Sequence, residues 1–213
     1  MKSPSIYPNK LPNKPSILVR ELHSGHRERI RSHLLSLGEE DRYLRFGMAA
    51  SDSFISDYVD SINFSRDSVF AVFDNKLDIL GMAHLAYQAE GNNSVLTAEF
   101  GVSVSANGRE QGIGTSLFQR AAIHSRNTKV EILYVHCLSS NAAMMHIARK
   151  AGMTVEYSYG EADAYLRLPP GDQNSLLAES MQEKAATIDY SIKENIRNAQ
   201  RISASLWKMP AWA

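Results

Sequence analysis

The stretch from Glu99 to Gly114 (EFGVSVSANGREQGIG) constrains this chain more than any other segment. A run typical of a β-strand leads through a short turn into Arg109-x-x-Gly112-x-Gly114, and a run typical of a helix follows. Glycines at the start of a helix let backbone N–H groups approach a phosphate, because no Cβ is in the way. The unpaired amides and the helix dipole then favour an anion, and Arg109 can add its charge. The stretch therefore predicts a site for the diphosphate of a cofactor.

The spacing of these residues argues against two common nucleotide-binding motifs. The P-loop needs Gly-x4-Gly-Lys-Ser/Thr, and no lysine follows Gly112 or Gly114. The dinucleotide fingerprint needs a third glycine where Leu117 stands, and an acidic residue about 20 positions further on at a strand end. A bare Gly-x-Gly before a helix is also common in ordinary loops, so the turn alone does not identify the cofactor.

The whole run is more specific than its glycines. Val102 and Val104, then Arg109-x-x-Gly-x-Gly, then Asn141 after the next expected strand, resemble the GNAT superfamily of acyl-CoA N-acyltransferases. The resemblance covers roughly residues 16–168 and is strongest over residues 98–153. It implies that acetyl-CoA is the cosubstrate.

The resemblance also implies a set of cofactor contacts. In the family, the backbone of the strand before the turn pairs with the pantetheine arm, and its amides hold the thioester carbonyl. The amides over 109–115 would meet the pyrophosphate, and Asn141 would contact the pantetheine, although a plain helix N-cap at Asn141 needs no ligand. The predicted cofactor-binding residues are Val102, Val104, Arg109, Gln111, Gly112, Ile113, Gly114, Thr115 and Asn141.

Glu99 is the predicted general base. A lysine-type amine, with a pKa of about 10.4, is almost wholly protonated at neutral pH, so a carboxylate must take its proton directly or through a water. In a strand, Glu99 shares one face with Thr97, Gly101 and Ser103, which leaves room for a ligand beside the carboxylate. The pattern alone also fits a surface glutamate or a structural ion pair. The resemblance favours the base, because GNAT enzymes commonly place a catalytic glutamate on this strand.

The sequence assigns no general acid. In the family, the run after the asparagine is often Asn-x-x-Ala-x-x-Leu-Tyr-x-Lys-x-Gly-Phe, and the tyrosine protonates the departing thiolate. Here the run is NAAMMHIARKAGM, which places Ala148 at the tyrosine position. A thiol with a pKa of about 8.5 leaves tolerably as the anion, so an acid is helpful rather than obligatory. His136, Cys137 and His146 lie nearby in the sequence and could substitute, but structural roles are favoured for all three.

Composition narrows the class of protein. The 213 residues suit one α/β domain with extensions, and 23 basic residues balance 23 acidic ones, so nothing indicates nucleic acid or a membrane surface. The single cysteine fits a reducing compartment, and the chain has neither an apolar stretch of about 20 residues nor a signal peptide, so we expect a cytoplasmic protein. The seven histidines show no metal-ligand spacing, so we expect no metal.

The order of the predicted elements gives a mixed α/β fold with a largely antiparallel sheet flanked by helices, as the resemblance implies. We divide the chain into a flexible arm at residues 1–15, a GNAT-like domain at 16–168 and a helical extension at 171–213. Strands are predicted over 16–22, 68–73, 79–87, 95–104, 131–138, 154–159 and 164–168, and helices over 26–37, 52–62, 112–126 and 141–152. We expect the strand over 131–138 to be covered on both faces, because it is apolar on both.

Two helical segments carry further expectations. The basic and histidine side chains of the first helix should form a solvated face; they are Arg27, Arg29, Arg31 and His33. The segment over 35–46 (LSLGEEDRYLRF) predicts an amphipathic turn and helix with Leu44 and Phe46 buried. Together with the AEFGVSV run, it looks like a GNAT branch known for protein lysine acetylation.

The tail predicts one long helix with an apolar stripe. Its apolar residues recur at steps of three and four: Met181, Ala185, Ile188, Ile192, Ile196, Ala199, Ile202 and Leu206. A lone helix cannot bury such a stripe, so it must pack on something. Packing on its own domain and pairing with a second subunit, as a homodimer, are equal alternatives.

The predicted function is transfer of an acetyl group from acetyl-CoA to a primary amine, on a small molecule or a protein lysine, with Glu99 as base. The alternative is a non-catalytic acyl-CoA-binding sensor, which the missing tyrosine at Ala148 favours slightly. The sequence does not indicate which amine is the acceptor.

Overall fold

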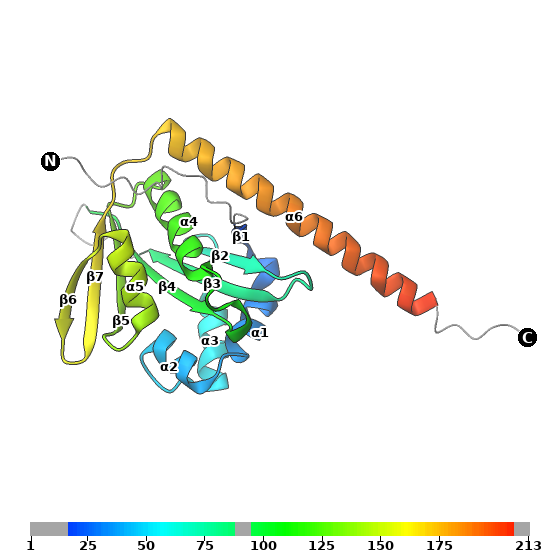
Figure 1. Ribbon diagram of the computed structural model, residues 1–213, viewed down its shortest axis with the longest axis horizontal. Helices are drawn as coiled ribbons and strands as arrows, with labels where there is room; N and C mark the ends of the chain where they lie inside the picture. Colours follow the sequence, from blue (N-terminus) through cyan, green and yellow to red (C-terminus); the bar gives the residue numbers. More distant parts are fainter. Residues whose placement is uncertain (1–16, 88–94, 207–213) are drawn as a thin grey trace, which may run out of the picture.

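The protein is described by a computed structural model that covers residues 17–87 and 95–206. Its centre is a seven-stranded sheet with the order β1-β2-β3-β4-β5-β7-β6 (Figure 1). All neighbouring strands are antiparallel except β4 and β5, which run parallel. The predicted fold class, a mixed and largely antiparallel sheet with flanking helices, is therefore confirmed. The predicted arm at residues 1–15 lies outside the described residues.

The predicted elements are present, with boundaries shifted by a few residues. The strands are β1 (Arg20–Leu22), β2 (Ser68–Phe73), β3 (Ile79–Tyr87), β4 (Thr97–Val104), β5 (Ile132–Leu138), β6 (Thr154–Ser158) and β7 (Glu161–Arg167). The helices are α1 (Arg27–Leu35), α2 (Glu39–Phe46), α3 (Asp52–Ser61), α4 (Ile113–Asn127), α5 (Ala142–Ala151) and α6 (Gln173–Leu206). Short 3-10 turns precede α1 (Ser24–His26) and α4 (Ala106–Gly108).

Helices cover both faces of the sheet (Figure 1). β2 shows the result most clearly, because all six of its residues are buried. Phe70 and Val72 pack into one apolar cluster with α4 and α5, whereas Val69 and Ala71 on the opposite face pack with α1 and α3. α4 contributes buried side chains to the first of these clusters, among them Ile113, Leu117, Ala121 and Ala122. Burial on both faces fixes the sheet rigidly beside the cavity described below.

Side-chain caps fix the start of two of the predicted helices. Ser51 begins α3 by accepting a hydrogen bond from the backbone N–H of Phe54 at 3.1 Å. Asn141 begins α5 by accepting from the N–H of Met144 at 3.0 Å, and Gly152 ends that helix at a φ of +72°.

Two predictions about burial are wrong. The face of β5 that bears His136 is not covered, and the His136 side chain is 44% exposed, because β5 separates from β4 and this face looks into a cavity. Leu44 and Phe46 of α2 are only half-buried, since they line the same cavity.

The basic face predicted for the first helix is not simply solvated. Each of its side chains bonds a neighbouring element, so these groups dock α1 onto α3 and the sheet. The contacts are Arg27 to the carbonyl of Ile62 at 3.0 Å, Arg29 to the carbonyl of Leu77 at 2.7 Å, Arg31 to Asp60 at 2.7 Å, and His33 to the carbonyl of Ile79 and the hydroxyl of Ser103, both at 2.9 Å. Burial lowers the pKa of His33 to about 4, so this histidine is neutral at neutral pH.

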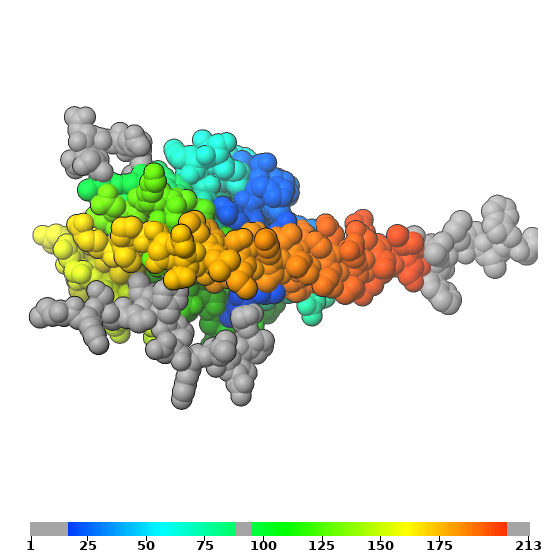
Figure 2. Space-filling view, turned by 90° about the horizontal axis from the view of Figure 1, so that it is seen from above, coloured from blue at the N-terminus to red at the C-terminus, as the bar shows by residue number. Residues whose placement is uncertain are grey.

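The tail forms the long helix α6, which packs on its own domain through the face opposite the predicted stripe. Ala186 and Tyr190 are buried against the domain, whereas Met181, Ile188 and Ile192 on the other face are 55–63% exposed. Figure 2 shows α6 lying across the domain and extending past it. The stripe itself is therefore not covered by the domain. No helix in the described part of the chain is long and apolar enough to span a membrane.

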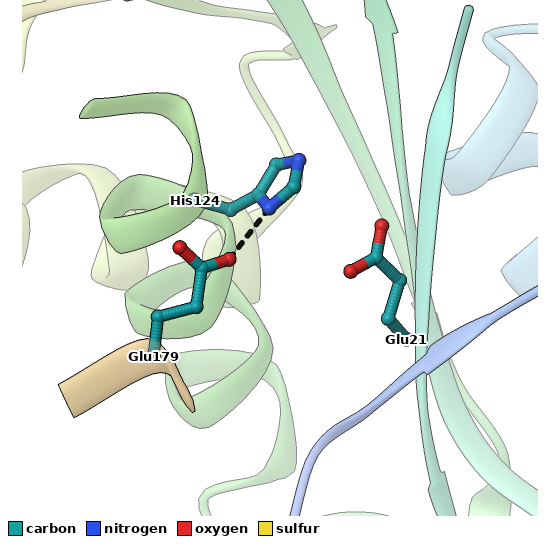
Figure 3. Close-up of side chains that lie close together, drawn as sticks. All are labelled: Glu21, His124 and Glu179. Carbon is teal, nitrogen blue, oxygen red and sulfur yellow. Dashed lines mark hydrogen bonds and ion pairs between the residues drawn. The ribbon is translucent and has the colours of Figure 1, made fainter. Parts of the chain in front are cut away.

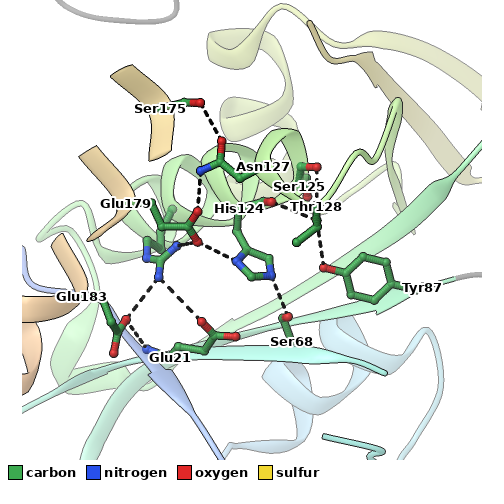
Figure 4. A network of polar contacts seen from close by, with 11 residues as sticks. Glu21, Ser68, Tyr87, His124, Ser125, Asn127, Thr128, Ser175, Glu179 and Glu183 are labelled. Atoms are coloured by element: carbon green, nitrogen blue, oxygen red, sulfur yellow. Dashed lines mark hydrogen bonds and ion pairs between the residues drawn. The ribbon is translucent and has the colours of Figure 1, made fainter. Parts of the chain in front are cut away.

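A polar cluster holds α6 on α4; we call Arg120, His124, Asn127, Glu179 and Glu183 the α4–α6 latch (Figure 4). Glu179 accepts from Arg120 and His124, both at 2.6 Å, and from the side-chain amide of Asn127. Glu183 accepts from Arg120 at 3.2 Å. Burial of Glu179 favours its neutral form, but the bonds from His124, Asn127 and Arg120 outweigh burial and lower its pKa from 4.5 to about 2.

Two residues of the latch, His124 and Glu179, lie beside Glu21 of β1, and the three side chains are close enough together to hold a cation (Figure 3). The sequence did not indicate this cluster, because its members come from β1, α4 and α6. The guanidinium of Arg120 already bonds Glu179 and lies 3.8 Å from Glu21, so the cluster is supplied with positive charge by the chain itself.

The latch predicts a pH-dependent stability. Because the pKa of Glu179 is depressed in the folded state, its stabilising effect is present above pH 4.5 and is lost as the pH falls toward 2. Glu179→Gln should lower the free energy of unfolding by up to about 3 kcal/mol at pH 7 and change it little near pH 2. Urea titrations at both pH values test this, with Glu194→Gln, an exposed position on the same helix, as control. An equal loss at both pH values would contradict it.

Candidate active site

The sheet forks between β4 and β5. The two strands pair only where residues 97–99 face residues 132–134, although β4 continues to Val104 and β5 to Leu138. Glu99 is the last paired residue of β4, so the fork opens directly after it. β4 keeps its partner β3 on the other side up to Val104. Its second half is therefore held in place while its β5-facing edge has no strand partner.

A cavity of about 1060 Å³ fills the fork. Its walls come from the parted halves of β4 and β5, from α2, from the first turn of α4 and from α5. All the predicted site residues except Gln111 lie on this wall: Glu99, Val102, Val104, Arg109, Gly112, Ile113, Gly114, Thr115 and Asn141. Gln111 is exposed, and its side-chain amide donates to the carbonyl of Asn107 at 2.7 Å instead.

The start of α4 has the features of an anion site. Gly112 stands at the N-cap with a φ of +88°, a left-handed conformation that favours glycine, and no side chain caps the helix. The N–H groups of the first turn are therefore left to an external acceptor on the cavity wall. Glu110 also has a positive φ of 60°, which is uncommon for a residue with a Cβ and indicates a turn held under constraint.

Arg109 of this turn is paired with a carboxylate of the chain. Its guanidinium bonds Asp41 of α2, which also lines the cavity. Arg109 is 54% exposed, so the ion pair is screened by water and contributes at most about 1 kcal/mol. A diphosphate at the start of α4 would compete with Asp41 for this arginine.

Glu99 is exposed on the cavity face of β4. Two titratable residues of the facing strand β5, Tyr134 and His136, share one carboxylate, that of Asp163 on β7. Asp163 accepts a hydrogen bond from the hydroxyl of Tyr134 at 2.7 Å, and it lies 2.7 Å from Nδ1 of His136. The hydrogen bond to Asp163 raises the pKa of His136 against a smaller opposing effect of burial, and the charge of Glu99 raises it further. Burial and the Asp163 carboxylate raise the pKa of Tyr134, which keeps this tyrosine neutral.

The other two candidate acids are less suitable. Cys137 follows His136 on β5 and is buried, whereas His136 is exposed. Burial raises the pKa of the Cys137 thiol to about 11. His146 is exposed on α5. Ala148, at the position where the family often has tyrosine, is fully buried and is not part of the cavity wall.

Sequence reasoning missed the contribution of α2 and of the His136–Asp163 pair. Asp41 and Arg45 of α2 lie more than 50 residues before Glu99, and Asp163 reaches β5 from a later strand. Only the cross-strand pairing and helix packing bring these groups to the cavity.

The sequence and the structure were compared with known proteins. The family model of the acetyltransferase (GNAT) domain matches residues 17–154. The chain belongs to the GNAT family. The resemblance of its motifs to this superfamily is thus confirmed, and with it the predicted class of enzyme, an acyl-CoA-dependent N-acyltransferase. No curated protein matches the chain in a sequence search.

Solved GNAT structures share the fold. The GNAT domain of S. lividans PAT matches with a TM-score of 0.60 and 18% sequence identity, over 70% of this chain and 89% of that one. Spermidine N-acetyltransferase from Vibrio cholerae, solved with CoA and spermine, matches with a TM-score of 0.54 and 20% identity, over 70% and 94%. RimL, a ribosomal L7/L12 α-N-protein acetyltransferase solved with CoA, matches with a TM-score of 0.54 and 16% identity, over 72% and 94%.

The Asp41–Arg109 pair makes a prediction about CoA affinity. Asp41→Asn should tighten CoA binding by up to about five-fold, because Arg109 would no longer have to leave a carboxylate to reach the diphosphate. Isothermal titration calorimetry with CoA measures the effect, and Glu40→Gln, an exposed neighbour on the same helix, is the control. Unchanged or weaker binding by Asp41→Asn would show that Arg109 does not contact the diphosphate.

Proposed function

We propose that this protein transfers the acetyl group of acetyl-CoA to a primary amine by direct attack, with Glu99 as general base. The observation that carries the proposal is the fork, which places a carboxylate at the point where β4 loses its partner. The pantetheine arm would take the place of the missing strand pairing along β4, with the amides of Val102 and Val104 as its partners. The pyrophosphate would bind the uncapped first turn of α4.

The reaction joins the amine nitrogen to the thioester carbon and breaks the C–S bond. Glu99 accepts the proton of the attacking amine, and backbone amides of β4 stabilise the oxyanion that forms. The thiolate then takes a proton. All three candidates line the cavity, and we propose His136 as the donor because it is bonded to Asp163. Cys137 is buried with a raised pKa, and His146 has no carboxylate within 4.0 Å among the described residues.

A non-catalytic acyl-CoA sensor is the second candidate function. Ala148, in place of the usual tyrosine, favours it, whereas Glu99 and His136 on the cavity wall favour the enzyme. The acceptor of the enzyme would be a small molecule or a protein amine; the structurally similar proteins named above include one solved with spermine and one that acts on a ribosomal protein. Release of free CoA in the presence of amines separates the two functions.

Replacing the proposed base, Glu99, should lower the rate of acetyl transfer without weakening CoA binding. Glu99→Gln keeps the size of the side chain but cannot accept the proton, so kcat should fall about 100- to 10,000-fold while the Kd for CoA stays unchanged. Stopped-flow thiol release and calorimetry measure the two quantities. Glu156→Gln on β6, exposed and away from the cavity, is the control. Thiol release at the unaltered rate would rule out Glu99 as the base.

The proposed acid predicts a shift in the pH profile. His136 donates a proton only while charged, so kcat should fall as the pH rises through its raised pKa. Asp163→Asn removes the carboxylate that raises this pKa, and the alkaline limb of the profile should move to lower pH. A merely structural effect of the substitution would reduce kcat equally at every pH and leave the limb in place, and that result would contradict the assignment.

We also propose that the exposed stripe of α6 pairs with a second copy of this chain. The steps of three and four residues make one continuous apolar face, as in coiled coils, and the domain occupies only the opposite face. Leu177 extends this face by one turn before Met181, and the large exposed residues of the extended face are Leu177, Met181, Ile188, Ile192, Ile196 and Ile202. Burying on the order of 100 Å² of each in both copies gives roughly 1,200 Å², the lower bound of specific interfaces. The balanced charge of the chain does not oppose self-association.

The dimer is tested by mass in solution. Sedimentation equilibrium of the unaltered protein should give twice the chain mass at micromolar concentration, and the double variant I188E/I192E should give the single mass. Gln182→Glu, exposed on the same helix but beside the stripe, adds a comparable charge and serves as control. A single mass for the unaltered protein, or a dimer that persists in the double variant, would overturn the proposal.

A further inference from the structure

A guanidinium stands next to Glu99 on the cavity face of β4. Arg45 of α2 lies flat against Gly101: a Cβ on this glycine would be 2.6–2.8 Å from Nη2, Cζ and Nη1 of the arginine. Gly101 follows Glu99 by two residues, so it lies on the same face of the strand at a distance of about 7 Å. A carboxylate and a guanidinium are therefore neighbours on one wall of the cavity.

Arg45 differs from the other arginine on this wall. Arg109 is paired with Asp41, whereas Arg45 has no carboxylate within 4.0 Å among residues 17–87 and 95–206. Arg45 is half-buried, and a charge in that position is stabilised when an opposite charge is supplied. The cavity thus contains positive charge that the described chain does not neutralise by an ion pair.

A buried chain of hydrogen bonds fixes the position of Arg45. Its Nη2 donates to the hydroxyl oxygen of Tyr58 at 2.8 Å, and the hydroxyl lies 2.7 Å from Nδ1 of His84. Arginine can only donate, so the hydroxyl of Tyr58 accepts from Arg45 and donates its own proton to Nδ1 of His84. The neutral His84 ring then carries its proton on Nε2, which lies 3.5 Å from Asp67. Burial, with the charge of Arg45, lowers the pKa of His84 to about 4, so this polarity is stable at neutral pH.

Among residues 17–87 and 95–206, one of the five N–H donors of Arg45 is hydrogen-bonded, which leaves paired N–H groups of the guanidinium for a carboxylate in the cavity. The rings of Phe46 and Tyr58 lie 5.0 and 5.5 Å from its guanidinium carbon. Met48 and Phe54 continue this wall with apolar surface. A guanidinium positioned by Tyr58, which is itself bonded to His84, is organised for binding rather than only for covering a glycine.

We propose that the acceptor is an amino acid with an apolar side chain, whose carboxylate binds Arg45 while its ammonium group faces Glu99. The proposal rests on the function proposed above. Glu99 takes one proton from the ammonium group and releases it to solvent, and the free amine nitrogen then bonds to the acetyl carbon. Glu99 takes the second proton from this nitrogen, the C–S bond breaks, and the thiolate takes a proton from His136, which gives CoA and an N-acetyl amino acid. The two opposite charges lie at neighbouring positions on one wall of the cavity, as the two ends of a zwitterion require, and the apolar wall formed by α2 and α3 receives the side chain.

Matched acceptors test the carboxylate directly. Leucine, methionine and phenylalanine are compared with isoamylamine, 3-(methylthio)propylamine and 2-phenylethylamine, which lack only the carboxylate, and with phenylalaninamide, whose amine is easier to deprotonate. Free CoA and the acetylated product are measured by thiol assay and mass spectrometry. We expect kcat/KM to be at least ten-fold higher for at least one amino acid than for its matched amine, and higher for phenylalanine than for its amide.

The variant Arg45→Gln should raise KM for the amino acids at least ten-fold and abolish the preference for an amino acid over its matched amine. Arg45→Lys should restore part of the lost affinity for amino acids, because lysine keeps the positive charge but lacks the paired N–H groups of a guanidinium. Arg149→Gln, an exposed arginine of α5 that is not on the cavity wall, is the control. Thermal unfolding and CoA affinity of each variant check that the fold and the cofactor site remain intact.

The outcomes separate this proposal from the proposed function. If simple amines react as well as amino acids, or Arg45→Gln leaves the preference in place, the acceptor class is wrong and acetyl transfer stands. If no acceptor releases CoA, the transferase proposal fails, and calorimetry of leucine, methionine and phenylalanine with the CoA-loaded protein still tests the carboxylate site. Binding that is lost in Arg45→Gln would support that site, and no binding of any of the three would overturn it.

Discussion

The candidate site depends on one interruption of backbone pairing, the parting of β4 from β5 after Glu99. β3 holds the other edge of β4 up to Val104, so β4 stays extended although it has lost one neighbour. The parted strands open the cavity, leave backbone groups for a ligand, and place Glu99 at its inner end. Continuous pairing of these strands would close the cavity and bring the residues after Tyr134 against β4.

Charge is distributed unevenly along this cavity. Near α4 the guanidinium of Arg109 is balanced by Asp41, and on β5 His136 is balanced by Asp163. Arg45 is held by Tyr58, His84 and Asp67 without an acidic partner of its own among the described residues. The described residues of α6 do not line the cavity, so the α4–α6 latch and the exposed stripe are physically separate from the chemistry.

Local sequence signals predicted the helices and strands, and they singled out Glu99, the glycine turn and Asn141, which the structure brings to one cavity. Strand periodicity, the N-cap Asn141 and the glycine turn at Gly112 are short-range features, and each lies where it was expected. The contributions of Arg45 and of the His136–Asp163 pair could not be predicted, because these residues meet the cavity only through helix packing and cross-strand pairing. The tail shows a similar limit: periodicity found its apolar stripe, but Ala186 and Tyr190, which dock the helix, belong to a polar face whose partners lie on α4 and β1.

The central claim is that the cofactor occupies the fork by pairing with the free edge of β4. Amide NMR of the protein during titration with CoA tests it most directly. We expect large shifts and slowed hydrogen exchange at residues 102–104 together with residues 113–115, and unchanged signals in the α4–α6 latch. Perturbation of the α4 turn without any at residues 102–104, or binding that leaves both segments unaffected, would contradict it.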